Sequence, residues 1–335
     1  PSVTGMENPR VTDREPGALS TLPTPLEAAP RLAAAIGLGP ADLWVKRDDL
    51  LGPGGGGNKV RKLQYTVAAA LAAGATTLVT TGAAQSNHAR LTAAAGARLG
   101  LDVVLVLAGT GGVATGNLAL DAMLGARIVW AGDVDSGELE RRAARIIEQL
   151  TADGRVASQI PFGGSNAVGA RGYVDAGHEL LAQLPELAQV VVAVGSGGTA
   201  AGLTHALGAD RVLGVHTGAV PDPEARIGDL VVGLGGPSGD AAPALRLRTE
   251  QVGAGYSAFT EPVKDALLLA ARTEGLILDP VYTGRALAGL VEAVRDGDVR
   301  PGQSTVFLHS GGLPGLFGSD AAMTWADSLA DGEGS

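Results

Sequence analysis

The sequence predicts an α/β fold made of two parallel-sheet units of unequal size. Short β-branched segments alternate with helical stretches of about 10–15 residues, which is typical of βαβ units. Turn residues, mostly glycine, separate these segments. The alternation restarts after Gly163, so the glycine-rich loop at residues 153–165 is the expected linker between the two units.

The first unit contains predicted strands at residues 43–46, 76–81, 102–108 and 127–131. The helices expected beside them are residues 59–73, 85–99, 116–124 and 138–150. Asn58 is a candidate N-cap for the first of these helices. Gly74 and Gly100 follow the ends of two helices, as glycine commonly does.

The second unit has predicted helices at residues 167–183, 199–207, 261–274 and 284–296. Its predicted strands are residues 189–194, 211–216 and 304–309. The short polar tail after Ala330 is expected to be disordered.

Composition narrows the classes of partner. A formal net charge of −10 without a stripe of Lys and Arg predicts a small-molecule substrate and no nucleic acid. The chain has no cysteine, and its histidines lack metal-binding spacing, so neither a disulfide nor a metal site is expected. No run of about 18 apolar residues and no apolar leader core occur, which predicts no membrane partner and a cytoplasmic location.

The segment GPGGGGNKVRKL, residues 52–63, holds two of the four lysines in the chain. A glycine run before a helix suits an anion, but Asn58 and Val60 flank Lys59 where a Walker A motif needs Gly and Ser or Thr. A flexible connection with solvated lysines is the ordinary alternative. Placed in a first helical turn, Lys59 is expected to have a lowered pKa, which favours an amine that can form an imine.

Two further glycine-containing segments open predicted helices. In GAAQSNHAR, residues 82–90, the polar side chains and free N–H groups suit a carboxylate, although Ser86 is equally suited to simple capping. In AVGSGGTAAG, residues 193–202, the free N–H groups suit one phosphate. A dinucleotide is less suitable there, because the next strand ends at His216 without an acidic residue.

The last two segments, LDPVYTGRALAG at residues 278–289 and FLHSGGLPGLFG at residues 307–318, place Tyr282 and Ser310 just after strand ends. Ligands bind at this edge in open α/β sheets. Taken singly, each of these residues is better explained as an ordinary structural side chain.

Together, the motifs GGNKVRKL, QSNHAR, GSGGTAAGL, GAGYS, LDPVYTG and HSGGLPGLFG resemble a family of pyridoxal 5′-phosphate (PLP) enzymes. That family contains 1-aminocyclopropane-1-carboxylate (ACC) deaminase, D-cysteine desulfhydrase and L-cysteate sulfo-lyase. The resemblance extends from Lys46 to Gly318. It implies a tryptophan-synthase-β-like fold (fold type II), with a large cofactor domain of residues 1–55 plus 163–335. It also implies a small domain of residues 56–162, and a homodimer.

The resemblance also implies a role for each candidate residue. Lys59 would carry PLP as a Schiff base, and the freed amine would move a proton. Other residues would bind the phosphate, the ring oxygen and the ring nitrogen of PLP. These cofactor-binding residues are Asn87, Gly195, Ser196, Gly197, Gly198, Thr199, Tyr282 and Ser310. Ser86, Tyr256 and Tyr282 would join Lys59 in catalysis. The residues facing the substrate would be Gln85, Ser86, Asn87, His88 and Thr283.

The reaction expected is β-elimination from a small amino acid, as in D-cysteine desulfhydrases. In ACC deaminases a Glu commonly follows the second tyrosine, whereas Thr283 follows Tyr282 here. A hydroxyl at Ser310 would leave the pyridine nitrogen largely unprotonated, which suits elimination better than transamination. ACC ring opening, L-cysteate desulfonation and a non-catalytic PLP-binding or ligand-binding protein stay open as alternatives. Serine and threonine dehydratases are less similar, because they usually carry Ser-x-Lys.

Overall fold

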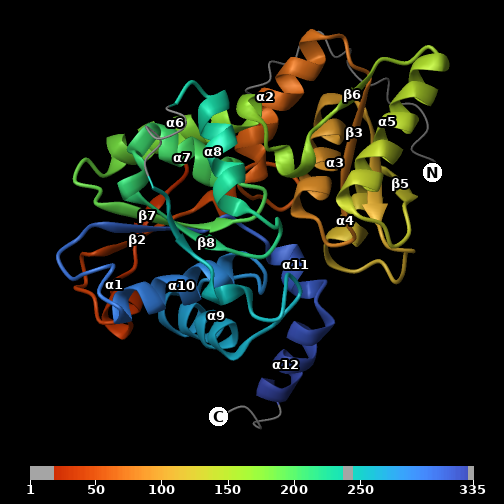
Figure 1. Ribbon diagram of the computed structural model, residues 1–335. Helices are drawn as coiled ribbons and strands as arrows, with labels where there is room; N and C mark the ends of the chain where they lie inside the picture. The colour runs from red at the N-terminus through yellow and green to blue at the C-terminus, as the bar shows by residue number, and fades with distance from the viewer. Residues whose placement is uncertain (1–18, 237–243, 331–335) are drawn as a thin grey trace.

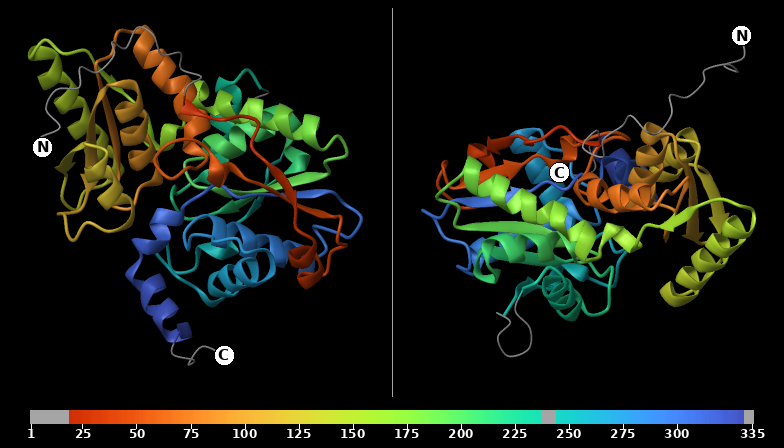
Figure 2. Two further views of the ribbon diagram at one scale, coloured as in Figure 1. Left: turned by 180° about the vertical axis from the view of Figure 1, so that it is seen from behind. Right: turned by 90° about the horizontal axis from the view of Figure 1, so that it is seen from above.

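A computed structural model describes residues 19–236 and 244–330 of the chain (Figure 1). The tail after Ala330 and the first 18 residues, which bear on the disorder and leader predictions, lie outside the described residues. Two sheets lie side by side in separate parts of the molecule (Figure 2). This arrangement confirms the predicted α/β fold with two mainly parallel sheets.

The larger sheet has the strand order β1-β2-β10-β7-β8-β9. Only β1 (Leu26–Ala28) is antiparallel, to its neighbour β2 (Leu43–Lys46). The parallel strands that follow are β10 (Thr305–Leu308), β7 (Gln189–Val194), β8 (Val212–His216) and β9 (Arg246–Arg248). Strand β10, from the end of the chain, therefore lies between strands from its beginning and its middle.

Helices cover both faces of the larger sheet because its strands are apolar on both sides (Figure 1). Val190 and Val192 of β7 face α6 (Ala167–Gln183), α7 (Gly198–Leu207) and α8 (Pro223–Gly233). Val191 faces the opposite layer, formed by α1 (Pro30–Ala35), α9 (Glu261–Glu274) and α10 (Thr283–Arg295).

The smaller sheet is entirely parallel, in the order β5-β4-β3-β6. Its strands are β3 (Thr77–Ala83), β4 (Asp102–Ala108), β5 (Arg127–Trp130) and β6 (Ala157–Gln159). One face is covered by α2 (Lys59–Ala72), α3 (Asn87–Leu99) and α4 (Gly116–Met123), and the other by α5 (Ser136–Ala152). All its strands lie within residues 77–159, and the proposed division at residues 55/56 and 162/163 stays a prediction.

The structure corrects two details of the sequence interpretation. Residues 153–165 are not only a linker, because β6 lies within them and pairs with β3. Asn58 stands at the N-cap position of α2, but its side chain does not cap the helix. Its Nδ2 instead donates to Thr199 Oγ1 at 3.1 Å, which links α2 to α7.

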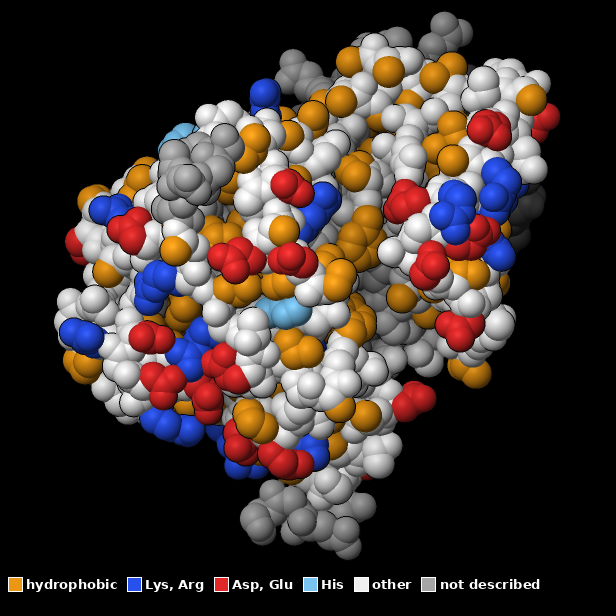
Figure 3. Space-filling view, viewed as in Figure 1, with side chains coloured by type: hydrophobic (Ala, Val, Ile, Leu, Met, Phe, Trp, Pro, Cys, Tyr) orange, Lys and Arg blue, Asp and Glu red, His pale blue; other side chains and the backbone are white. Residues whose placement is uncertain are grey.

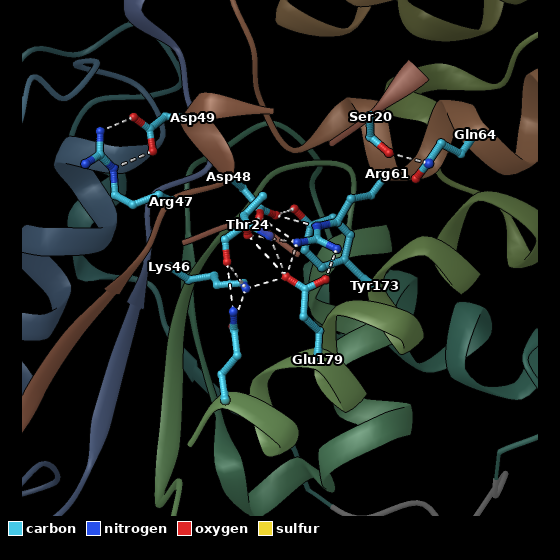
Figure 4. A network of polar contacts seen from close by, with 11 residues as sticks. Ser20, Thr24, Lys46, Arg47, Asp48, Asp49, Arg61, Gln64, Tyr173 and Glu179 are labelled. Atoms are coloured by element: carbon cyan, nitrogen blue, oxygen red, sulfur yellow. Dashed lines mark hydrogen bonds and ion pairs between the residues drawn. The ribbon is translucent and has the colours of Figure 1, made fainter. Parts of the chain in front are cut away.

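A buried polar network, defined here as Thr24, Lys46, Asp48, Arg61, Tyr173 and Glu179, fixes α2 to the larger sheet and to α6 (Figure 4). Arg61 donates to both carboxylate oxygens of Asp48, at 2.9 Å each, and pairs with Glu179 at 3.0 Å. Helix α6 can approach closely because residue 172 is glycine: a Cβ there would lie 2.2 Å from the Arg61 carbonyl oxygen. Lys59, two residues before Arg61, is thereby held against the larger sheet.

The molecular surface gives no sign of an extended charged region on the face shown in Figure 3. Acidic and basic side chains are interspersed there, with apolar ones between them. Among the described residues, no helix combines the length and apolar character needed to cross a bilayer.

Candidate active site

A cavity lies where the two sheets meet, at the carboxyl ends of β3, β7 and β10. It encloses about 630 Å³, counting the part that opens to solvent, a size typical of cofactor sites. The described residues that line it are Asn58, Lys59, Lys62, Ser86, Asn87, His88, Phe162, Gly163, Ala193, Gly195, Ser196, Gly197, Thr199, Ala200, Tyr282, Ser310 and Gly311. All five predicted segments thus contribute to one cavity.

Lys59 reaches the cavity from the first turn of α2. The glycine run before it has positive φ at residues 54–57, and at Gly56 a Cβ would lie 2.0 Å from the Asp49 carbonyl oxygen, so only glycine fits. The Lys59 Nζ lies 3.5 Å from Ser196 Oγ. Burial lowers the pKa of Lys59 to about 8. The lowered pKa agrees in direction with the sequence prediction, but its cause is burial of the amine and not the helix N-terminus.

Arg90, which sequence reasoning left without a role, holds the glycine run in place. Its buried guanidinium donates from Nη1 to the Gly54 carbonyl and from Nη2 to the Gly56 carbonyl, the latter at 3.0 Å. The loop in front of Lys59 is therefore tied to α3, whose first residues also line the cavity.

Lys62 is a second cavity residue to which the sequence pattern gave no role. It lies one helical turn after Lys59, so both amines share a face of α2, and this spacing is the signal that could have found it. Its Nζ donates to Ser165 Oγ at 2.9 Å, and Ser165 Oγ lies 2.7 Å from Ser196 Oγ. Burial, followed by the charge of Lys59, lowers the pKa of Lys62 well below its ordinary value.

The turn from β7 to α7 forms a cradle of backbone N–H groups beside these amines. Gly197 adopts φ +86°, and α7 begins at Gly198. A Cβ on Gly198 would lie 2.6 Å from Ser165 Oγ and 3.1 Å from Lys62 Nζ, so the space in front of the helix depends on glycine. A helix N-terminus next to two lysines is suited to a phosphate group.

The start of α3 presents polar groups to the cavity that the protein itself leaves free. The Oδ1 of Asn87 is buried and has no hydrogen-bond partner among the described residues. Ser86 caps α3, because its Oγ accepts from the Ala89 N–H at 3.1 Å. Since this bond uses only a lone pair, the Ser86 hydroxyl proton is still available for a ligand.

His88 is neutral, and its tautomer follows from its neighbours. The Thr80 hydroxyl donates to the Ile160 carbonyl at 2.8 Å, so it must accept from His88 Nε2, which lies 2.9 Å away. The Nδ1 atom then bears the lone pair and has no partner among the described residues. Burial, followed by the Lys59 and Lys62 charges, lowers the pKa of His88 well below its ordinary value.

The two predicted tyrosines form a hydrogen-bonded pair at the opposite wall. Tyr282 lines the cavity and packs against Gly195, where a Cβ would lie 2.9 Å from the ring. The Tyr256 hydroxyl lies 2.6 Å from the Tyr282 hydroxyl, although Tyr256 does not line the cavity itself. Burial raises the pKa of Tyr282 well above its ordinary value, so its hydroxyl keeps its proton.

Besides Tyr256, three predicted residues are not brought to the cavity wall. Thr283 is fully buried, and its hydroxyl donates to Asp279 Oδ1 at 2.7 Å. Gln85 accepts from the Asn117 N–H at 2.9 Å and donates to the Thr115 carbonyl at 3.0 Å. Gly198 belongs to the cradle but is not among the residues that line the cavity. Substrate contacts of Thr283 and Gln85 stay predictions.

Comparisons with known proteins agree with this geometry. Residues 18–311 match the family described as pyridoxal-phosphate dependent enzymes. The chain belongs to this family. It is 38% identical to the D-cysteine desulfhydrase of Salmonella choleraesuis over 310 residues, covering 88% of this chain and 93% of the relative.

A Pyrococcus abyssi protein, provisionally named a 1-aminocyclopropane-1-carboxylate deaminase, is 39% identical over 305 residues, which cover 88% of this chain and 90% of the relative. A crystal structure described as an ACC deaminase homologue superposes with a TM-score of 0.82 at 34% identity, covering 97% of this chain and 99% of that one. Within the PLP-dependent enzymes, the chain therefore has fold type II and belongs to the ACC deaminase and D-cysteine desulfhydrase family.

The cavity of this PLP-dependent enzyme fits its cofactor on three independent observations. The cradle at residues 197–199 has room in front of it only because Gly198 lacks a Cβ, and Lys62 stands beside it. The unpartnered Oδ1 of Asn87 marks an amide that is free for a polar ring substituent. The Lys59 amine lies in the same cavity, with a pKa lowered far enough for a neutral nucleophile to be present.

Replacing Gly198 by Ala is expected to weaken PLP binding at least about tenfold, because the new Cβ would displace Ser165 and Lys62 from the cradle. The measurement is fluorescence titration of apoprotein with PLP. Gly228→Ala is a matched control, because nothing lies within 4 Å of that added Cβ. Equal PLP affinity in the Gly198→Ala protein and the wild type would show that the phosphate lies elsewhere.

Proposed function

We propose that this PLP-dependent enzyme is a deaminating lyase that removes a β-substituent from a small amino acid, with D-cysteine as the first candidate. D-cysteine and water would give pyruvate, ammonia and hydrogen sulfide. The observation that carries this proposal is the absence of any carboxylate among the described residues lining the cavity. Lys59 is then the group best placed to take a proton from Cα.

Bound PLP would supply the electron sink that weakens the bonds to the substrate Cα. Lys59 would hold the cofactor covalently, and Lys62 and the N–H groups at residues 197–199 would hold its phosphate. Asn87 would face the ring oxygen, and Ser310, which lines the cavity just after β10, would face the ring nitrogen. With a hydroxyl at that position the ring nitrogen is not given a proton, which suits the rapid departure of a leaving group.

The remaining steps are assigned to neutral groups. The Ser86 hydroxyl, whose proton is free, would donate to the substrate carboxylate. The Lys59 amine would accept the Cα proton as the Cβ–S bond breaks and the sulfur leaves with the bonding electrons. The Tyr282 hydroxyl, oriented by Tyr256, would donate a hydrogen bond to the departing sulfur, which leaves as hydrosulfide. Water then hydrolyses aminoacrylate to pyruvate and ammonia.

Uptake of PLP by the apoprotein should depend on pH with a midpoint near the Lys59 pKa of about 8. Only the neutral amine attacks the PLP carbonyl, so uptake should become faster as the pH rises through this value. Stopped-flow absorbance between pH 6.5 and 11 would measure the rate constants. A pH titration of free PLP would correct for ionisation of the cofactor itself. A midpoint near the ordinary lysine value of 10.5 would contradict the buried environment.

A product assay across several amino acids tests the proposed reaction. The panel contains D-cysteine, L-cysteate, D-serine, β-chloroalanine and ACC, and the assay separates pyruvate from 2-oxobutyrate. Pyruvate from D-cysteine at the highest kcat/KM supports the proposal. Formation of 2-oxobutyrate from ACC, without pyruvate from the other substrates, would overturn it.

ACC ring opening is the second candidate, favoured by the name of the Pyrococcus abyssi relative. ACC has no hydrogen on Cα, so this reaction would require a different first step. The position after Tyr282 argues against it, because Thr283 is not a carboxylate and is turned toward Asp279. The same product assay distinguishes the two reactions.

We also propose that the enzyme is a cytoplasmic homodimer. The support for both properties is the resemblance of its motifs to the family. Light scattering of the purified holoenzyme would measure the number of subunits.

A further inference from the structure

Arg285, in the first turn of α10, is a buried cation that no role assigned above explains. Its side chain is fully buried, and it forms no ion pair among the described residues. Its partners are instead four backbone carbonyl groups. A buried guanidinium without a carboxylate is costly unless its donors are well used, so these partners are informative.

Three of the four carbonyls belong to one short loop. Nη2 of Arg285 donates to the carbonyl oxygens of Gly255 at 2.9 Å, Tyr256 at 2.9 Å and Ala258 at 2.8 Å. Nη1 donates to the carbonyl of Thr217, just beyond β8. The loop 255–258 belongs to no helix or strand, so one guanidinium anchors backbone that regular structure does not hold.

This loop carries the outer member of the tyrosine pair. Tyr256 is 38% exposed and depends on its backbone for its position. Its hydroxyl lies 2.6 Å from that of Tyr282, and the two rings meet edge to face with centroids 6.1 Å apart. Tyr282 precedes Arg285 by three residues at the start of α10. The first turn of α10 therefore positions Tyr282 directly and Tyr256 through the contacts of Arg285 with its loop.

We propose that Arg285 is a positioning residue: it clamps the loop 255–258 so that Tyr256 orients the Tyr282 hydroxyl at the cavity. The catalytic part of this inference rests on the proposed function, whereas the clamping of the loop does not. Removing the Arg285 guanidinium should increase the mobility of the loop 255–258 but should affect the stability of the whole fold less. The freed carbonyls of Gly255 and Tyr256 lie near the surface, where water can replace the guanidinium.

The first test measures the loop directly. Hydrogen–deuterium exchange of peptides covering residues 253–259 is followed in the holoenzyme without substrate, for wild type, Arg285→Met and Arg285→Lys. Arg285→Met is expected to speed exchange in this segment about tenfold or more, with α7 and β8 unchanged. Arg285→Lys is expected to fall between the other two proteins, because one ammonium cannot reach all four carbonyls.

Arg246→Met is the matched control. Arg246 also donates to carbonyls, those of Asp210 at 2.9 Å and Asp298 at 3.3 Å, but it lies on the edge strand β9 away from the cavity. The Arg246→Met substitution should leave the exchange rates of residues 253–259 unchanged. If these residues exchange in the Arg285→Met protein as slowly as in the wild type, the proposed clamp is wrong. If Arg285→Met does not fold, the Arg285→Lys protein decides by the same criterion.

The second test asks whether Arg285 acts through Tyr256. Arg285→Met, Tyr256→Phe and the double variant are compared on the best substrate of the panel. Each single variant should lower kcat about tenfold with a smaller change in KM, and the double variant should be no worse than Tyr256→Phe alone. Additive losses, or an unchanged kcat in Tyr256→Phe, would overturn the link. Because exchange needs no substrate, failure of the proposed reaction and failure of the clamp give different results.

Discussion

The Lys59→Ala protein is expected to be colourless and to lose activity by roughly four orders of magnitude or more, because one side chain supplies both the covalent bond to PLP and the amine that moves the Cα proton. The absorption spectrum of purified protein measures the first effect and the product assay the second. Borohydride reduction of wild type, followed by peptide mass spectrometry, should place the pyridoxyl group on Lys59.

Lys264→Ala is the matched control for this substitution. Lys264 lies on α9 and pairs with Glu261, outside the cavity, so its loss should change neither colour nor rate. A pyridoxyl group found on Lys62 would reverse the roles given to the two cavity lysines. A wild-type protein that takes up no PLP would support the non-catalytic alternative.

Replacing Arg61 by Met should lower the free energy of unfolding by about 3–5 kcal/mol, the cost usually measured when one partner of a buried ion pair is removed. Arg61 and Asp48 are 1% and 0% exposed in their side chains, so Asp48 cannot find water in place of the guanidinium, and Glu179, which is 13% exposed, can do so only in part (Figure 4). Burial alone would raise the pKa of Glu179, but the hydrogen bonds and charges of Arg61 and Lys46 outweigh burial and lower this pKa to about 2, so the Glu179 carboxylate is charged at neutral pH. Urea unfolding at pH 7 measures the loss.

The Arg141→Met variant shows how much free energy of unfolding is lost when a surface ion pair is broken. Arg141 pairs with Glu138 on α5, but its side chain is 62% exposed, so the expected loss is below about 1 kcal/mol. An equal, small loss in both variants would show that the buried network contributes no more than a surface pair. The Arg61→Met enzyme should also take up PLP less well, because the network fixes the helix that carries Lys59.

Local pattern was enough to locate most of the strands and helices. The strands β4 and β7 and the helices α6 and α9 have the predicted bounds, because each is a continuous apolar or amphipathic segment bounded by turn residues. The elements that the pattern did not reveal are short or polar, such as β1, β6 and β9 with three residues each. Helices α8 and α12 (Asp320–Ala330) are exceptions, with 11 residues each. Helix α8 begins with Asp222 as N-cap and Pro223, which is a recognisable helix start.

The residues of the candidate site likewise fall into those that the sequence could predict and those that it could not. Residues within the motifs, such as Lys59, Asn87 and Tyr282, could be predicted because the motifs together resemble those of the family, although Tyr282 does not follow a strand as expected. Arg61, Arg90 and Arg285 could not, since their partners lie at distances in sequence that no local pattern records. Arg61 and Glu179, for example, are separated by 118 residues.

Among the described residues, β10 is the last strand in chain order, and it lies in the interior of the large sheet. Until residues 305–308 leave the ribosome, β1 and β2 on one side and β7 to β9 on the other are two half-sheets, each with an open inner edge. By then the small sheet, encoded between residues 77 and 159, can already be complete. The cavity therefore closes only when β10 joins the halves and brings Ser310 to its wall, so we expect that a nascent chain retains no PLP until residues 305–310 have been added.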